Sequence, residues 1–264
     1  MRRSKRMRRM FVGGLLTLGL SVGRTYATPS TTYWTPCTID FQSYKVGHVT
    51  YDNYTTLAKK GPTRGGQAFA NDLGLTAGVL PFQKLQMEAG VDWLEPTDYP
   101  LFGNAKIGYT EDMFFKGAPA LEAGIFNVGT RKGITDQDIA YITTGRSLPG
   151  GLGRLHLSGY IGNAKVLRSS EGGLQNTGFM AGYDYGFWNV KSPEGDYNRL
   201  VLAADFSSGK NVVGGGGAGI YYYFSKDVDI LSGPVWFNDR TINGDWKWTT
   251  QLDINFSPWL SASK

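Results

Sequence analysis

The sequence predicts an all-β protein: a closed antiparallel up-and-down transmembrane β-barrel of about 12 strands (range about 10–14), preceded by a cleaved signal peptide. Three observations predict this fold. Apolar and polar residues alternate over segments of about ten residues, glycine-rich turns separate these segments, and aromatic residues concentrate near segment ends. After the N-terminal region, no segment approaches the length of about 18 consecutive apolar residues that would predict a transmembrane helix.

The first 27 residues have the features of a secretory signal peptide. Six Lys and Arg side chains precede an apolar run from Met10 to Val22, and a cleavage site follows at about Ala27. The run is too short to cross a bilayer as a helix. We therefore expect four parts: a signal peptide (1–27), a periplasmic N-terminal lead (28–41), a transmembrane β-barrel (42–256) and a C-terminal periplasmic tail (257–264).

The charge of the chain changes when the signal peptide is removed. The whole chain has 27 basic and 22 acidic residues, but seven of the basic ones lie in residues 1–27. The remainder has 20 basic and 22 acidic residues, a net charge of −2. The basic character of the full chain is therefore no reason to expect nucleic-acid binding.

Alternation is clearest in the segment WKWTTQLDINF, residues 246–256. Trp248, Leu252 and Ile254 share one face of this predicted strand, whereas Lys247 and Asp253 lie on the other. The expected strands are approximately 42–55, 69–80, 84–94, 102–110, 118–128, 136–146, 153–163, 175–187, 198–208, 212–224, 227–238 and 246–256. No helix of useful length is predicted.

A soluble β-sandwich also alternates, so three features decide in favour of a membrane barrel. The strands are about ten residues long, the length that a tilted strand needs to cross a bilayer. Aromatic residues near strand ends suit the two membrane interfaces. The polar face carries charges of both signs, as the lumen of a barrel does. Closure is then required, because lipid cannot satisfy the free backbone groups of an edge strand.

Two groups of residues follow from this fold. The residues expected to line the pore are Glu88, Asp92, Lys106, Glu122, Arg154, His156, Asp184, Arg199, Asp205, Lys247 and Asp253. The aromatic residues expected at the membrane interfaces are Trp93, Tyr185, Trp236, Trp246, Trp248 and Phe256. The lumen charges either select permeating ions or solutes or pair with one another across a narrow lumen, and the sequence leaves both possibilities open.

The signal peptide, the alternating strands and the terminal WKWTTQLDINF resemble the bacterial outer-membrane β-barrel, or porin-like, class. This resemblance implies a location in the outer membrane of a double-membraned bacterium. It also implies recognition by the barrel-assembly machinery through Leu252, Ile254 and Phe256. The tail 257–264 departs from the class, whose members typically end at the aromatic residue. The segment LGLTAGVLPFQKLQMEAGVDWL, 73–94, also resembles an uncharacterised group of such barrels.

Other motifs give little indication of chemistry. His156 and Ser158 resemble the His-x-Ser segment of outer-membrane phospholipases, but they lie on the polar face, away from lipid. The glycine-rich stretch 212–219 lacks the features of a phosphate-binding loop, and glycines in a strand more often allow bulges, tight curvature or close packing of lumen side chains. Cys37 is the only cysteine. No catalytic residues, metal site or cofactor are predicted.

Two main hypotheses about function follow. The first is an outer-membrane channel, porin-like and not an enzyme, that passes small hydrophilic solutes or ions through a mixed-charge lumen. The second is a structural or partner-binding barrel with a packed lumen. A soluble periplasmic β-protein and an outer-membrane phospholipase are remote alternatives. The sequence names neither the permeating solute nor the oligomeric state, and it does not explain the tail.

Overall fold

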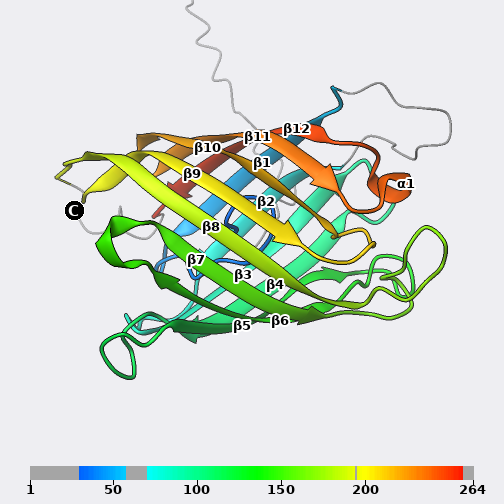
Figure 1. The fold of residues 1–264 in the computed structure, drawn as a ribbon, viewed down its shortest axis with the longest axis horizontal. Coiled ribbons are helices and arrows are strands. Elements are labelled where there is room, and N and C mark those ends of the chain that lie inside the picture. Colours follow the sequence, from blue (N-terminus) through cyan, green and yellow to red (C-terminus); the bar gives the residue numbers. More distant parts are fainter. Residues whose placement is uncertain (1–29, 58–69, 194, 258–264) are drawn as a thin grey trace, which may run out of the picture.

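Twelve antiparallel strands close into one barrel in the computed structural model, which describes residues 30–57, 70–193 and 195–257 (Figure 1). Each strand pairs with its neighbours in the sequence, and β1 pairs with β12 to complete the circle. The predicted fold class and strand number are therefore confirmed. The predicted signal peptide and all of the predicted tail after Ser257 lie outside the described residues.

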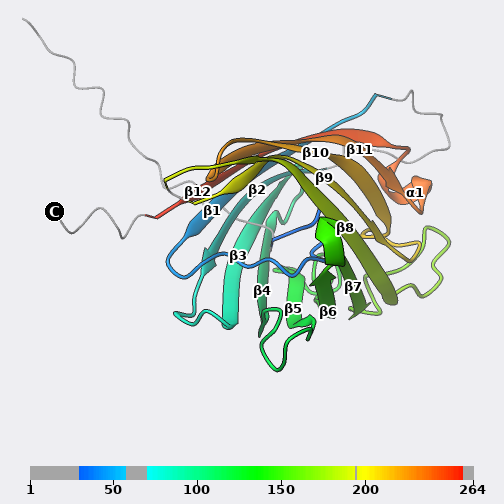
Figure 2. The same ribbon diagram turned by 60° about the vertical axis from the view of Figure 1, so that its left-hand side comes forward.

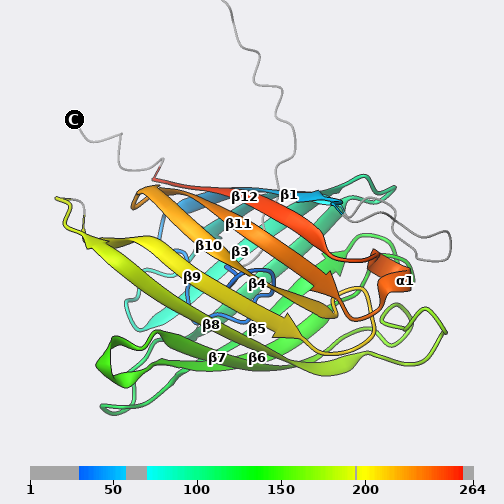
Figure 3. The ribbon, with the colours of Figure 1, turned by 45° about the horizontal axis from the view of Figure 1, so that its top comes forward.

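The strands lie close to the predicted ranges. They are β1 (Gly47–Thr55), β2 (Asn71–Gly78), β3 (Leu85–Glu95), β4 (Leu101–Tyr109), β5 (Ala120–Gly129), β6 (Ile139–Ser147), β7 (Arg154–Ile161), β8 (Thr177–Val190), β9 (Tyr197–Ser207), β10 (Gly215–Ser225), β11 (Val228–Phe237) and β12 (Lys247–Phe256). We call the end of the barrel where odd-numbered strands finish the loop end, and the opposite end the turn end. Both ends are visible in Figure 3.

The helical content of the described residues is small. A 3-10 turn, η1 (Pro149–Gly151), connects β6 to β7, and a one-turn helix, α1 (Arg240–Asn243), precedes β12. The side chain of Asp239 caps α1 by accepting a hydrogen bond from the backbone N–H of Thr241 at 3.0 Å. Neither helix is long or apolar enough to cross a membrane, and the described part of the chain contains no other helix.

Strand β12 closes the barrel as its alternation predicts. Its register against β1 runs from Phe256 opposite Gly47 to Trp248 opposite Thr55. Trp248 and Phe256 are exposed on the outer surface, whereas Lys247 on the opposite parity is fully buried. Thus one strand presents an apolar face outward and a polar face inward.

The same division holds around the barrel. On β6 and β7, Ile142 and Leu157 are exposed outward, at 60 % and 49 %, while Thr143 and His156 are fully buried inside. A soluble protein rarely exposes such a continuous apolar surface. An apolar exterior around a polar interior is the pattern of a barrel surrounded by lipid.

The segment before β1 differs from its prediction. The described part of the predicted periplasmic lead, residues 30–41, lies inside the barrel. Residues 42–46, which were expected to begin the first strand, lie outside any strand, and Ser43, Tyr44 and Lys45 are exposed. The chain turns at Lys45, whose φ is 62°, and β1 begins only at Gly47. We call residues 30–46 the N-terminal plug. A barrel of twelve strands has a lumen wider than its own side chains fill, which gives the plug its space.

The outward face provides a test of the lipid environment. We expect Leu157→Arg to reduce the free energy of unfolding in lipid vesicles by about 2–4 kcal/mol, because a charge near the bilayer midplane is poorly solvated. The matched control is Leu152→Arg, since Leu152 is 63 % exposed but lies in the turn before β7. There the cost should be about 0–1 kcal/mol. If denaturant titrations show that Leu157→Arg and Leu152→Arg lower the free energy of unfolding equally, the mid-barrel surface is not in lipid.

Candidate functional site: the plugged lumen

The N-terminal plug lies across the lumen and has cavities on both sides. Figure 2 shows it as the blue segment enclosed by the strands. A cavity of about 530 Å³ lies toward the turn end and is lined by Phe41, His48 and Asp253 among others. A cavity of about 140 Å³ lies toward the loop end and is lined by Trp34, Asp72 and others. The plug therefore separates the two mouths of the barrel.

Asp205 on β9 holds the first turn of the plug. Its Oδ2 atom accepts hydrogen bonds from the backbone N–H groups of Tyr33, Trp34 and Thr35, at 3.1, 2.8 and 2.6 Å. The hydroxyl of Thr35 donates a fourth, at 2.9 Å. Asp205 is only 5 % exposed, so these donors replace the water that a buried carboxylate loses. The plug backbone is thereby fixed in one position.

Glycines of the wall provide room for the ring of Tyr33. A Cβ atom at Gly217 or Gly219 on β10 would collide with this ring, and one at Gly233 on β11 would approach its hydroxyl. The hydroxyl donates a hydrogen bond to the backbone carbonyl of Pro234 at 3.0 Å. The glycine-rich stretch thus allows close packing in the lumen, as interpreted from the sequence, and the side chain it accommodates belongs to the plug.

A second contact joins the plug to β7 and β8. Arg154 donates to both carboxylate oxygens of Asp40 at 2.6 Å and to Asp184 Oδ1 at 2.8 Å. Asp184 Oδ2 also lies 2.7 Å from Nε2 of His156. Partial desolvation in the lumen raises the pKa of Asp40, which is still half exposed, but the Arg154 guanidinium outweighs this effect and holds that pKa below its ordinary value. Asp40 is therefore ionised at neutral pH.

A third contact involves charged residues of β3, β4 and β5. Glu88 accepts hydrogen bonds from the backbone N–H groups of Ser30 and Gln42, both at 2.7 Å. Lys106 lies 3.6 Å from Glu88 and 3.5 Å from Glu122, and it donates to the backbone carbonyl of Asp40. Its ammonium group also lies 4.7 Å from the ring centre of Phe41. Both ends of the plug are therefore fixed to the same side of the wall.

Cys37 lies at the centre of the plug and is fully buried. Its Sγ atom is 3.1 Å from the hydroxyl of Ser158, which also lies 2.6 Å from the hydroxyl of Thr143. Burial raises the pKa of the Cys37 thiol to about 12, so the reactive thiolate is scarce while the plug is in place. Ser158 bonds to Cys37 and Thr143, whereas His156 bonds to Asp184, so these contacts do not form the dyad that a phospholipase requires.

The predicted lumen residues thus fall into groups. Seven of them contact the plug directly or through a neighbour: Glu88, Lys106, Glu122, Arg154, His156, Asp184 and Asp205. Three others face the interior away from these contacts. Asp92 accepts from Asn104 at 2.9 Å, Lys247 donates to Thr56 at 2.9 Å, and Asp253 lies 3.2 Å from His48.

Arg199 differs from the other predicted lumen residues. Its guanidinium lies 5.8 Å from the ring centre of Trp188, 5.6 Å from that of Tyr197 and 5.9 Å from that of Tyr222. Trp188 is 62 % exposed and has a φ of 61°, which interrupts the alternation at the turn end of β8. Arg199 therefore lies among aromatic rings at the end of the barrel and joins none of the charge clusters described above.

The aromatic residues expected at the interfaces lie on the outer surface in two groups. Tyr185, Trp236, Trp246, Trp248 and Phe256 are 36–42 % exposed, and Trp93 is partly exposed. Trp93, Trp236, Trp246 and Trp248 lie toward the loop end, whereas Tyr185 and Phe256 lie toward the turn end. Two aromatic levels on a barrel match the two interfaces of a bilayer.

Sequence reasoning missed the plug and a group of acidic residues. Asp52 and Asp72 face each other on β1 and β2 and are buried, and Asp229 on β11 is buried near the turn end. The available signals were the parity of these residues and the lack of alternation before residue 47. Glycines on the inward parity of β10 were a further signal, because they leave space for a side chain from elsewhere.

A comparison with protein-family models gives no match, and a comparison with curated proteins gives none either. Solved structures do match. The NanC porin is 6 % identical with a TM-score of 0.50, over 80 % of this chain and 98 % of that one. An outer membrane channel from Pseudomonas putida F1 is 12 % identical with a TM-score of 0.43, over 80 % of this chain and 94 % of that one. OmpF from Salmonella typhi is 10 % identical with a TM-score of 0.40, over 80 % of this chain and 96 % of that one.

The contact with Asp205 predicts how firmly the plug is held. We expect Asp205→Ala to increase the rate of maleimide labelling of Cys37 about tenfold or more, because four donors of the plug lose their acceptor. The matched control is Asp229→Ala, which removes a buried carboxylate of β11 that lies beside Asp253 of β12. If the wild-type, Asp205→Ala and Asp229→Ala proteins are all labelled equally slowly, Asp205 does not hold the plug in this way.

The ion pair of Asp40 predicts a dependence on pH. A carboxyl group whose pKa is lower in the folded than in the unfolded protein stabilises the fold at pH values above its unfolded pKa, about 3.9. This stabilisation is lost as the pH falls from that value toward the pKa of the folded protein. Asp40 is 49 % exposed, so screening limits the contribution to about 1 kcal/mol. Asp40→Asn should therefore lower the unfolding midpoint by about 2–4 °C.

Circular dichroism in detergent measures this difference between the wild-type and Asp40→Asn proteins. We expect the difference to stay constant from about pH 8 to about pH 5 and to shrink below about pH 4. A difference that disappears between about pH 8 and pH 5 would mean that the Arg154 pair does not lower the pKa of Asp40.

The chain has the fold of the porin-like outer-membrane barrels, with a lumen that its own N-terminal segment occupies.

Proposed function

We propose that this protein is an outer-membrane channel for small hydrophilic solutes or ions, and that the N-terminal plug closes it in the state described here. The observation that carries the proposal is a polar lumen with a cavity on each side of the plug, of about 530 and 140 Å³. A barrel whose only role was structural would not need water-accessible space at both ends. The permeating species would pass charges of both signs along the wall.

The proposed location is the outer membrane of a double-membraned bacterium. Its support is the apolar outer face with aromatic residues at two levels. The turn end would face the periplasm, and the loop end the outside. Leu252, Ile254 and Phe256 are exposed on the outer face of β12, where the barrel-assembly machinery would recognise them.

The contacts of the plug are of a kind that would let it leave the lumen while the strands of the wall stay paired. It continues directly into β1, and in the part of the chain that the structure describes its backbone bonds to the backbone of the wall only at Gly78, which pairs with Lys45 and Val46. Its other described contacts are bonds between backbone and side chains or between side chains. Every strand of the barrel retains both of its neighbours when such a segment moves. Release of the plug would therefore open the lumen and leave the barrel closed.

The alternative is a structural or partner-binding barrel with a permanently packed lumen. One observation favours it: the plug supplies hydrogen-bond donors to Asp205 and Glu88, two buried carboxylates of the wall. The two proposals differ in what happens when the plug is released. The channel conducts, whereas the packed barrel loses stability and gains no conductance.

A disulfide between the plug and the wall tests the channel. The Sγ atom of Cys37 lies 3.1 Å from the hydroxyl oxygen of Ser158, so Ser158→Cys would place two thiols within bonding range. In planar bilayers, we expect the reduced variant to show openings as the wild-type protein does. Oxidation should abolish these openings because the plug is tethered, and a reductant should restore them.

Two controls make the result specific. The wild-type protein has a single cysteine, so oxidant and reductant should leave its conductance unchanged. Heat-modifiable gel migration should show that the variant remains a folded barrel. Openings that persist in the fully oxidised variant would refute the plug as the gate, and a wild-type barrel that never conducts would favour the packed-lumen alternative.

A further inference from the structure

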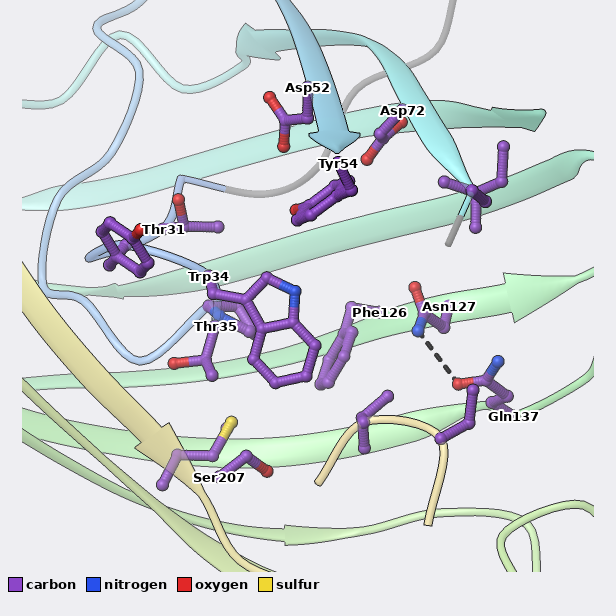
Figure 4. A pocket seen from close by; sticks show the side chains of 17 residues that line it. Thr31, Trp34, Thr35, Asp52, Tyr54, Asp72, Phe126, Asn127, Gln137 and Ser207 are labelled. Carbon is purple, nitrogen blue, oxygen red and sulfur yellow. Dashed lines mark hydrogen bonds between the residues drawn. The ribbon is translucent and has the colours of Figure 1, made fainter. Parts of the chain in front are cut away.

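The cavity at the loop end is enclosed by the plug and by several strands. Its lining includes Trp34 and Thr35 of the plug, Asp52 and Tyr54 of β1, and Phe126 of β5, as Figure 4 shows. Its volume is about 140 Å³. This site differs from the conducting path proposed above, because it forms only while the plug is seated.

Two carboxylates of this cavity have no cationic partner among the described residues. Asp52 and Asp72 lie directly opposite each other on β1 and β2 and are 7 % and 6 % exposed. Asp52 accepts a hydrogen bond from the hydroxyl of Thr50 at 2.7 Å. The Oδ1 atom of Asp72 is buried and has no hydrogen-bond partner in the described part of the chain. Adjacent buried carboxylates repel each other, so a positive charge between them would be favourable.

Aromatic rings complete the same cavity. In Figure 4, the side chains of Asp52 and Asp72 lie near the ring of Tyr54, and the rings of Trp34 and Phe126 lie beyond it. The face of an aromatic ring attracts a cation, and the attraction increases when water is excluded. Carboxylates beside ring faces are the combination that suits an ammonium group attached to an apolar body.

A metal ion suits this cavity less well. The described residues contain no group of three or more His, Cys, Asp or Glu side chains with the geometry to hold one. A hard divalent ion requires about six oxygen ligands, whereas much of this lining is apolar. The chemistry of the lining therefore favours an organic cation.

We propose that the loop-end cavity binds a small organic cation, with Asp52 and Asp72 neutralising its charge and the rings of Trp34, Tyr54 and Phe126 enclosing its apolar part. Because Trp34 belongs to the plug, the bound cation would contact the plug and the wall at once. Binding would thus stabilise the seated plug by mass action. The site requires no conductance, so it stands or falls independently of the proposed channel.

Calorimetric titration of the folded full-length mature protein in detergent tests this proposal. The probe is choline, and its neutral isostere 3,3-dimethylbutan-1-ol has the same shape without the charge. We expect choline to bind with a Kd below about 1 mM, and the isostere to bind at least about tenfold more weakly. Asp72→Asn, which preserves size, should weaken choline binding about tenfold or more.

A matched control separates the site from the rest of the lumen. Asp229→Asn changes another buried carboxylate at the turn-end cavity and should leave the affinity for choline unchanged. Heat-modifiable gel migration confirms that each variant is folded. The proposal is overturned if choline binds with a Kd above about 1 mM, if the isostere binds equally well, or if Asp72→Asn binds choline like the wild-type protein.

Discussion

The contact between the carboxylate of Asp205 and the N-terminal plug is the interaction on which the rest of the lumen depends. A carboxylate buried in the wall of a barrel needs donors, and no strand can supply them because the strand backbone is already paired. Three backbone N–H groups and one hydroxyl from residues 33–35 meet this need. The plug in turn can reach Asp205 only because glycines of β10 leave space for Tyr33.

The wall and the interior of the barrel are held in place by different interactions. The wall is fixed by closure, since each strand satisfies its backbone through its neighbours and lipid tolerates no free edge. The interior is fixed by charge, because Asp205, Arg154 and Glu88 each hold part of the plug through bonds that involve side chains. Bonds of this kind can exchange with water when the plug leaves, whereas the strand pairs cannot. This difference makes a closed and an open state possible on one scaffold.

The sequence predicts the wall far better than it predicts the interior. Period-two alternation and turn residues give twelve strands, and the parity of 246–256 correctly assigns both faces of β12, with Lys247 inside and Trp248 outside. Parity also places Glu88, Lys106 and Asp205 inward. It could not show that the lead folds back into the lumen, because residues 30–46 have no periodicity and their partners in the wall lie more than 30 residues away. Arg199 was predicted to line the pore, but it lies among aromatic rings beside Trp188, whose φ of 61° disrupts the local alternation.

The central claim is that the N-terminal plug closes a channel, and the most direct measurement is the conductance of a mature chain that lacks residues 30–43. Such a chain retains all twelve strands of the described barrel, including the start of β1 at Gly47. In planar bilayers, we predict discrete conductance steps that are larger and more persistent than those of the intact mature chain. A folded, heat-modifiable barrel whose conductance is unchanged by the deletion would contradict the account.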